Sequence, residues 1–256
     1  MGAVEALFVL ALGAAFGSWI AGLTYRLEKD LPLDQLGRSA CPRCGRKLGP
    51  LEVIPVLSYL WLGGRCRGCG ARISPRYLAL EVSFALASLS LWLREGLSPA
   101  WALRASGAFV LGANAATDLE SGYVFDLLSL YPGLLALPLL SALGWYQVAP
   151  LNPLDPALGG VALGGSMWAI RLLYPSGVGE GDAKVAFTMG VFLGLKLGLL
   201  ALYLSFLFGG ALGLALLLLG RAGRKTPLPF VPFMAFGYLV SALLGERLLS
   251  LAGWSW

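Results

Sequence analysis

The chain has 256 residues, of which 57% are hydrophobic and 13% charged, and its formal net charge is +5. This composition is too apolar for a water-soluble domain, and several runs reach the roughly 20 apolar residues that a membrane span requires. We therefore expect an all-α polytopic membrane protein embedded in a lipid bilayer, because a membrane barrel would show weaker, alternating segments. In such a protein a positive charge reports topology and not nucleic-acid binding.

The absence of histidine limits the chemistry. Ser-His-Asp, Cys-His and histidine-ligated metallopeptidase sites are all excluded. The four cysteines lie within residues 41–69, and if they bind a metal no thiol remains as a nucleophile. Carboxylates are then the favoured catalytic groups. A Ser-Lys site is the second choice, because Lys184 has no obvious serine partner.

Residues 3–25 form the first predicted span, and Gly13, Gly17 and Gly22 give it a small-residue face on which another helix can pack closely. No basic region precedes it and it is long enough to span, so we expect it to stay and not to be cleaved as a signal peptide. Residues 26–76 form the large polar insert. Its ten basic residues are Arg26, Lys29, Arg38, Arg43, Arg46, Lys47, Arg65, Arg67, Arg72 and Arg76. By the positive-inside rule this insert is cytoplasmic and both termini lie outside.

About eight transmembrane helices are expected in all. After the first, they cover residues 77–93, 100–117, 124–145 with kinks at Pro132 and Pro138, 157–174, two helices within 183–220, and 234–251. The run 183–220 is too long for one span, so we expect a tight turn near Lys196–Gly198. The Pro-rich loop 147–156 is placed outside, and Arg221, Arg224 and Lys225 mark the inner side again. The predicted domains are the first helix (1–25), the insert (26–76) and a membrane-embedded core (77–256).

The cysteines form two pairs, Cys41-Pro-Arg-Cys44-Gly and Cys66-Arg-Gly-Cys69-Gly. Two such knuckles are typical of a structural four-thiolate zinc site. Disulfides are rare on the cytoplasmic side, so redox pairs or free thiols are the weaker alternatives. A four-cysteine site has no open coordination position, so we assign it to folding and not to catalysis.

Two aspartates differ from the other carboxylates. Asp118 and Asp182 each lie at the inner end of a predicted span, and Gly179 and Gly181 beside Asp182 permit close approach of backbone or substrate. If the two carboxylates face each other at low dielectric they cannot both ionise, which gives the acid and base pair of an aspartic protease. The charged one would activate water, and the protonated one would donate to the scissile carbonyl oxygen. The alternative is that both merely cap helices.

The neighbours of this pair have candidate supporting roles. Asn114 shares a helical face with Asp118 and could orient it or bond to another helix. Lys184 follows Asp182 but points elsewhere on its helix. The carboxylates to test if either aspartate fails are Glu120, Asp126 and Glu180. Glu81 and Arg171 lie near inner helix ends, where we expect them to pair or to reach the interface.

At these residues the chain resembles the type IV prepilin peptidases, the GxGD-type membrane aspartic proteases of pilus and type II secretion systems. Asp118 matches the family's first catalytic aspartate, and Gly179-x-Gly181-Asp182-x-Lys184 matches the motif that carries the second. The other matching motifs, in chain order, are Gly17-Ser18 with Arg26-Leu27, Cys41-Pro42-x-Cys44, Ile54-Pro55-Val56-x-Ser58-Tyr59, Gly64-Arg65-Cys66-x-x-Cys69, Ile73-Ser74-x-Arg76-Tyr77 and Pro229-Phe230-x-Pro232-Phe233.

The resemblance implies an enzyme of the bacterial inner membrane that cuts pilin-like precursors at the cytoplasmic face, between a short basic leader and an apolar helix. It also implies, in many members, N-methylation of the new terminus with S-adenosylmethionine. Trp19 and Ala21 replace the family's phenylalanine and asparagine in the region tied to methylation, Phe125 replaces a proline, and Val231 replaces a glycine.

The charge of the insert bears on how it meets a substrate. A net-positive insert repels a basic leader at close range. It could instead hold the domain against anionic lipid headgroups, leaving the acidic residues Glu28, Asp30, Asp34 and Glu52 to meet the leader.

Two other functions compete with the peptidase. A proton-coupled transporter is disfavoured because no paired repeat is found. A zinc-stabilised membrane scaffold without protease activity would keep its function in Asp118→Asn and Asp182→Asn variants.

Overall fold

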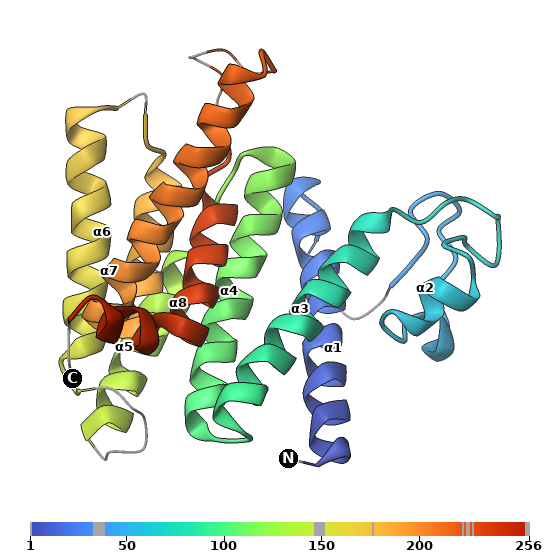
Figure 1. The fold of residues 1–256 in the computed structure, drawn as a ribbon. Coiled ribbons are helices and arrows are strands. Elements are labelled where there is room, and N and C mark those ends of the chain that lie inside the picture. The colour runs from blue at the N-terminus through green and yellow to red at the C-terminus, as the bar shows by residue number, and fades with distance from the viewer. Residues whose placement is uncertain are drawn as a thin grey trace. The chain divides into compact units, whose positions relative to one another are not determined.

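The computed structural model describes residues 2–32, 39–145, 152–175, 177–221, 223, 226 and 228–253. Within these residues the regular elements are all helices, and pairing between extended segments is limited to two isolated bridges. The elements are α1 (Ala3–Glu28), η2 (Pro50–Glu52), α2 (Leu57–Trp61), α3 (Pro75–Glu95), α4 (Pro99–Ser121), α5 (Leu130–Trp145), α6 (Asp155–Leu173), α7 (Glu180–Leu218) and α8 (Val231–Leu251) (Figure 1). The all-α class expected from composition is therefore confirmed for the described chain.

Five of these helices are long and apolar enough to cross a membrane: α1, α3, α6, α7 and α8. A shorter apolar stretch, Leu130–Leu143, lies in α5. The protein is thus an integral membrane protein, while the count of eight spans is not confirmed. Parts of two predicted loops, 147–151 and Arg224, Lys225 and Pro227, lie outside the described residues, as do Asp34 and Arg38.

The chain divides into two compact units, residues 1–97 and 98–256. In the first, α1 packs on α3 through the small residues predicted for this purpose. A Cβ on Gly13 would lie 2.5 Å from the Phe84 carbonyl oxygen, and one on Gly17 would lie 2.7 Å from the Glu81 Cα. Gly22 faces open space and does not share in this contact.

In the second unit, α6 packs on α7 through glycines. A Cβ on Gly159 would overlap the Gly190 carbonyl oxygen, and one on Gly164 would lie 2.8 Å from the Phe187 Cβ. Backbones that approach this closely are typical of membrane helix pairs, where small residues and van der Waals packing replace a hydrophobic driving force.

The long run 183–220 is divided, as expected, but at a different residue. Gly194 has φ 73° and ψ −175°, a conformation essentially restricted to glycine, and it interrupts α7. Beyond it the chain turns back, so that a Cβ on Gly198 would lie 3.5 Å from the Gly190 Cα (Figure 1). The predicted turn near Lys196–Gly198 was therefore placed a few residues too late, because Gly194 and not Gly198 has the left-handed φ.

Two other boundaries differ from prediction. α5 begins at Leu130 and not at residue 124, after a turn at residues 126–129. Pro132 lies in its first turn, where the missing amide costs no helical hydrogen bond, so only Pro138 is inside the helix. α8 begins at Val231 and not at 234, with Pro232 in its first turn. This earlier start places the N-terminal amides of α8 beside α4.

Candidate functional site

Asp118 lies in the last turn of α4. The helix ends at Gly122, whose φ of 68° forms a left-handed C-cap and whose amide bonds the Asp118 carbonyl oxygen. The side chain is 9% exposed, and its Oδ2 accepts a hydrogen bond of 3.0 Å from the amide of Val231 in the first turn of α8. A carboxylate is thus held at the N-terminus of a second helix, where free amides point toward it.

Asp182 lies in the first turn of α7. Its Oδ2 accepts the amide of Gly179, the N-cap residue, at 2.8 Å. Gly181 faces Val124, and a Cβ at this position would lie 2.5 Å from the Val124 Cβ. The two glycines of the motif therefore have separate roles: Gly179 supplies a donor to Asp182, and Gly181 permits close contact with the segment that follows α4.

The structure brings the two aspartates together. α4 ends and α7 begins at the same end of the second unit, the upper end in Figure 1. An electrostatic interaction links the carboxylates of Asp118 and Asp182, and Arg171 of α6 also interacts with Asp182. Arg171 is held by a 2.9 Å bond from Nη1 to the Val178 carbonyl oxygen. Two carboxylates close enough to interact in this way disfavour each other's ionisation, which is what paired acid and base chemistry requires.

Lys184 binds two of the other candidate carboxylates. Its Nζ lies 2.7 Å from Asp126 Oδ1 and 2.8 Å from Glu180 Oε1. The ion pair with Asp126 ties the segment before α5 to the start of α7. Asp126 and Glu180 are therefore engaged with a cation. Glu120 lies at the end of α4, where its side chain is exposed.

Asn114 of α4 also contacts the segment between α4 and α5, through a hydrogen bond to the backbone of that segment. Its Nδ2 donates to the Leu128 carbonyl oxygen at 2.7 Å, and Thr188 Oγ1 of α7 donates to the neighbouring Ser129 carbonyl oxygen at 2.5 Å. Asn114 and Thr188 thus fix the turn between α4 and α5, near Val124 and Asp126. Sequence reasoning missed Thr188, since a threonine in an apolar helix gives no signal by itself.

The four cysteines lie together in the first unit. Their Sγ atoms are all within 4.8 Å of one another, and Cys41 Sγ and Cys69 Sγ are 3.8 Å apart. A tetrahedral site with Zn–S bonds of about 2.3 Å has an S–S edge of about 3.8 Å. The cysteines are not in disulfides. The arrangement fits a four-coordinate metal ion.

The two knuckles have the same backbone pattern. Each first cysteine donates its amide across the knuckle, Cys41 to the Arg46 carbonyl and Cys66 to the Ala71 carbonyl, and the bridges Ala40–Lys47 and Arg65–Arg72 close them. Gly45 and Gly70 follow the second cysteine of each knuckle, both with φ 69°. The glycine after each cysteine pair is therefore required by a left-handed turn.

The pKa values of two of the thiols are shifted in opposite directions. The amides of Cys69 and Gly68 lower the pKa of Cys66 to about 6. The Arg46 amide favours the Cys44 thiolate, but the adjacent thiols and burial outweigh it and raise the pKa of Cys44 to about 11. All four thiols can ionise together only if a metal ion compensates their charge.

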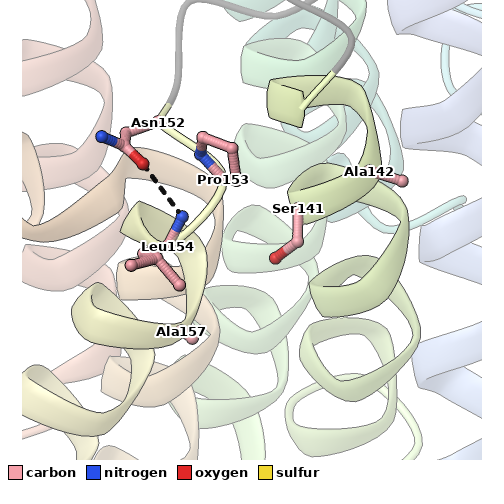
Figure 2. A pocket seen from close by; sticks show the side chains of 6 residues that line it. All are labelled: Ser141, Ala142, Asn152, Pro153, Leu154 and Ala157. Carbon is pink, nitrogen blue, oxygen red and sulfur yellow. Dashed lines mark hydrogen bonds between the residues drawn. The ribbon is translucent and has the colours of Figure 1, made fainter.

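A hollow lies between the ends of α5 and α6, lined by Ser141, Ala142, Asn152, Pro153, Leu154 and Ala157 (Figure 2). Asn152 Oδ1 accepts the amide of Leu154 at 3.2 Å and so stabilises its wall. None of these six side chains is titratable, so this hollow is not a candidate for acid and base chemistry.

Two family models match the chain. Residues 11–94 match the bacterial peptidase A24 N-terminal domain, and residues 105–214 match the type IV leader peptidase family. The first match contains the four cysteines, and the second contains both aspartates. No solved structure matches the chain significantly.

Curated relatives named prepilin leader peptidase/N-methyltransferase align over most of the chain. The Aeromonas salmonicida protein is 38% identical over 243 residues, which is 92% of this chain and 81% of the relative. The Bacillus subtilis protein is 35% identical over 246 residues, 94% of this chain and 97% of the relative. The Pseudomonas aeruginosa protein is 34% identical over 224 residues, which is 83% of this chain and 73% of the relative.

Proposed function

The chain belongs to the type IV leader peptidase family, and from that premise we propose that it is an aspartic endopeptidase in which Asp118 and Asp182 remove the basic leader of prepilin-like precursors at the cytoplasmic face. The observation that carries the proposal is the electrostatic interaction between these two carboxylates. They come from helix ends that are 64 residues apart in the chain, and each is held by a backbone amide.

The proposed reaction needs one charged and one protonated carboxyl group. The charged carboxylate takes a proton from water as the water oxygen attacks the scissile carbonyl carbon, and the protonated carboxyl donates to the carbonyl oxygen. When the tetrahedral intermediate collapses, the C–N bond breaks and the leaving amine receives the proton taken from water. The amides of Val231 and Gly179 hold Oδ2 of Asp118 and Oδ2 of Asp182, so each carboxyl group is oriented by backbone before the reaction begins.

The location of the pair suits a substrate that is half in the membrane. The aspartates lie at helix ends, so a precursor with an apolar helix in the bilayer would present the peptide bond before that helix at their depth. The precursor class comes from the relatives, whose names include prepilin leader peptidase. The cytoplasmic orientation of the site and of the insert rests on the distribution of basic residues.

Two further parts of the proposal concern cofactors. We propose that the metal ion at the four cysteines is structural zinc, because the site is closed and all-thiolate. Methylation has less support from this chain's own residues. Ala21, in place of the family's asparagine, is fully buried and offers a cofactor no side-chain hydrogen bond. Transfer of labelled methyl groups from S-adenosylmethionine to the cleaved product tests the second activity.

The peptidase proposal is tested by cleavage of a model prepilin in proteoliposomes, followed by gel mobility. We expect Asp118→Asn and Asp182→Asn each to lower the cleavage rate by at least about 100-fold, as the loss of a general acid or base does. Asp155→Asn, which changes a carboxylate in the first turn of α6, is the matched control and should cleave at the wild-type rate.

The scaffold alternative makes the opposite prediction. If the two aspartates only cap helices, the single variants will cleave as the wild type does, or the wild type itself will not cleave. Zinc content and the thermal unfolding midpoint of each variant distinguish a lost catalytic group from a lost fold.

A further inference from the structure

The polar insert carries an apolar surface that its own fold leaves uncovered. In α2, Leu60 is 62% exposed and Trp61 57% exposed, and Leu57 is exposed beside them, while Ser58 is buried. Spacings of three and four residues place Leu57, Leu60 and Trp61 on one face of the helix. Leu51 and Val53, in and after η2, are exposed as well. We call these five residues the apolar patch.

The apolar patch lies beside the membrane spans of its unit. The amide of Val56, just before α2, donates to Glu81 Oε2 at 2.6 Å. Glu81 is the seventh residue of α3, about 9 Å along the helix from its start, and it packs on Gly17 of α1. α2 therefore begins level with the first turns of α3, and in Figure 1 the insert lies next to α1 and α3.

The start of α2 is fixed by an unusual turn. Val56 has φ 63° and ψ −55°, and the amide of Leu57 bonds the Pro55 carbonyl oxygen at 2.6 Å. This is a γ-turn with positive φ, which is rare and strained, and most of all for a β-branched residue. Such strain persists only where the surroundings hold it. Glu81, 6% exposed, supplies the bond that does so, and α2 is thereby held at one depth.

The charge around the apolar patch is positive. Residues 29–74 contain eight Lys and Arg and three Asp and Glu, a net charge of +5. Four thiolates with one Zn²⁺ contribute −2, which leaves +3. Arg65 and Arg67 lie four and six residues after the end of α2, and both are exposed. Apolar and aromatic side chains bordered by arginines are the composition of surfaces that enter the headgroup region of anionic membranes.

We propose that the apolar patch is an interfacial anchor for the zinc domain, inserted at the boundary of headgroups and acyl chains, with Arg65 and Arg67 at the lipid phosphates. Anionic lipid is favoured over a basic prepilin leader as the occupant, because the arginines beside the patch repel a basic peptide. The anchor follows from membrane integration and does not depend on the catalytic proposal.

The test is the depth of Trp61 in vesicles that contain full-length protein and phosphatidylglycerol. The fluorescence difference between wild type and Trp61→Phe isolates this residue from the other tryptophans. We expect it to be quenched by lipids brominated near the glycerol end of the acyl chains and protected from aqueous iodide. Protection from iodide should decrease when phosphatidylcholine replaces all the phosphatidylglycerol, or in the Arg65→Gln/Arg67→Gln variant.

Two further variants serve as controls for the position of the reporter. Leu57→Trp in the Trp61→Phe background moves the reporter to another residue of the patch and should give the same pattern. Arg43→Trp in that background places it on an exposed zinc knuckle and should be quenched by iodide. Zinc content of each variant verifies that the domain is folded.

Three outcomes would overturn the anchor. Quenching of Trp61 by iodide with none by brominated lipid would show that the patch lies in water. Quenching by iodide that disappears only when a prepilin peptide is added would make the patch a substrate surface. Insensitivity to both quenchers would show that protein covers it.

Discussion

At the scale of single residues, the contact between Gly181 and Val124 decides where Asp182 can lie. A Cβ at Gly181 would lie 2.5 Å from the Val124 Cβ, so Gly181→Ala must move the start of α7 away from the end of α4. Overpacking of this kind costs about 1–3 kcal/mol. We expect Gly181→Ala to cleave a model prepilin at least about tenfold more slowly, because displacement of a reacting group is costly.

A matched set of variants tests that explanation. Gly165→Ala changes a helical glycine that has open space around it and should retain wild-type activity. Val124→Gly removes the atom that the new Cβ would strike, so the double variant Gly181→Ala/Val124→Gly should recover part of the rate. No recovery would mean that Gly181 acts through something other than this contact.

The hydrogen bond from Val231 to Asp118 gives a second residue-scale prediction. Val231→Pro removes the amide donor at a helix position that tolerates proline, while Val231→Ala keeps the donor and removes only side-chain atoms. A bond to a charged group contributes about 1.5–3 kcal/mol. We expect Val231→Pro to lower kcat by about tenfold or more relative to Val231→Ala. Equal rates in the two variants would show that the bond does not position Asp118.

The sequence singles out candidate site residues better than it reveals the groups that hold them. The cysteine pairs are found by local spacing, and Asp118 and Asp182 by the cost of placing carboxylates at span ends. The structure brings the members of each set together. The Val231 amide is 113 residues from Asp118 and carries no side-chain signal, so spacing could not reveal it.

At the scale of elements, the interruption of α7 at Gly194 sets the path of the chain through the second unit. Its φ of 73° with ψ of −175° is open almost only to glycine. We expect Gly194→Ala to be destabilised by about 1–3 kcal/mol, which is the cost of such strain, and to melt at a lower temperature in detergent.

Gly210→Ala is the control for this prediction. Gly210 lies in the same helix with open space around it and no positive φ, so alanine there should be neutral or stabilising by up to about 1 kcal/mol. If the Gly194→Ala protein unfolds at the same midpoint temperature as the wild type, or at a higher one, α7 does not need the break at this residue.

The position of this break also shows the limit of helix prediction in apolar runs. Length alone requires that residues 183–220 be divided, since a single span is shorter. Gly190, Gly194 and Gly198 are equivalent by composition, however, and only tertiary packing decides which adopts the left-handed φ. Gly190 packs on Gly159 and Gly198 on Leu163, while Gly194 makes the turn.

At the scale of the whole molecule, the metal site and the aspartate pair lie in different compact units. The knuckles depend on few apolar contacts, since of the residues 39–74 only Cys41, Ser58, Gly64 and Cys66 are buried. Small domains of this kind obtain much of their folding free energy from the metal, with apparent binding free energies of about 10–16 kcal/mol for structural zinc. The second unit has its own packed helices and no cysteine.

Zinc removal should therefore unfold one unit selectively. We expect one zinc per chain, and we expect a strong chelator to abolish hydrogen-exchange protection at the knuckle amides of Cys41 and Cys66, which bond the carbonyls of Arg46 and Ala71. Amides within α4 and α7 should retain their protection, because these two helices pack against each other and against α8 within the second unit. Cys44→Ser should reproduce the chelated pattern without chelator. Loss of protection throughout α4 and α7 would show instead that the zinc domain supports the fold that holds the aspartates.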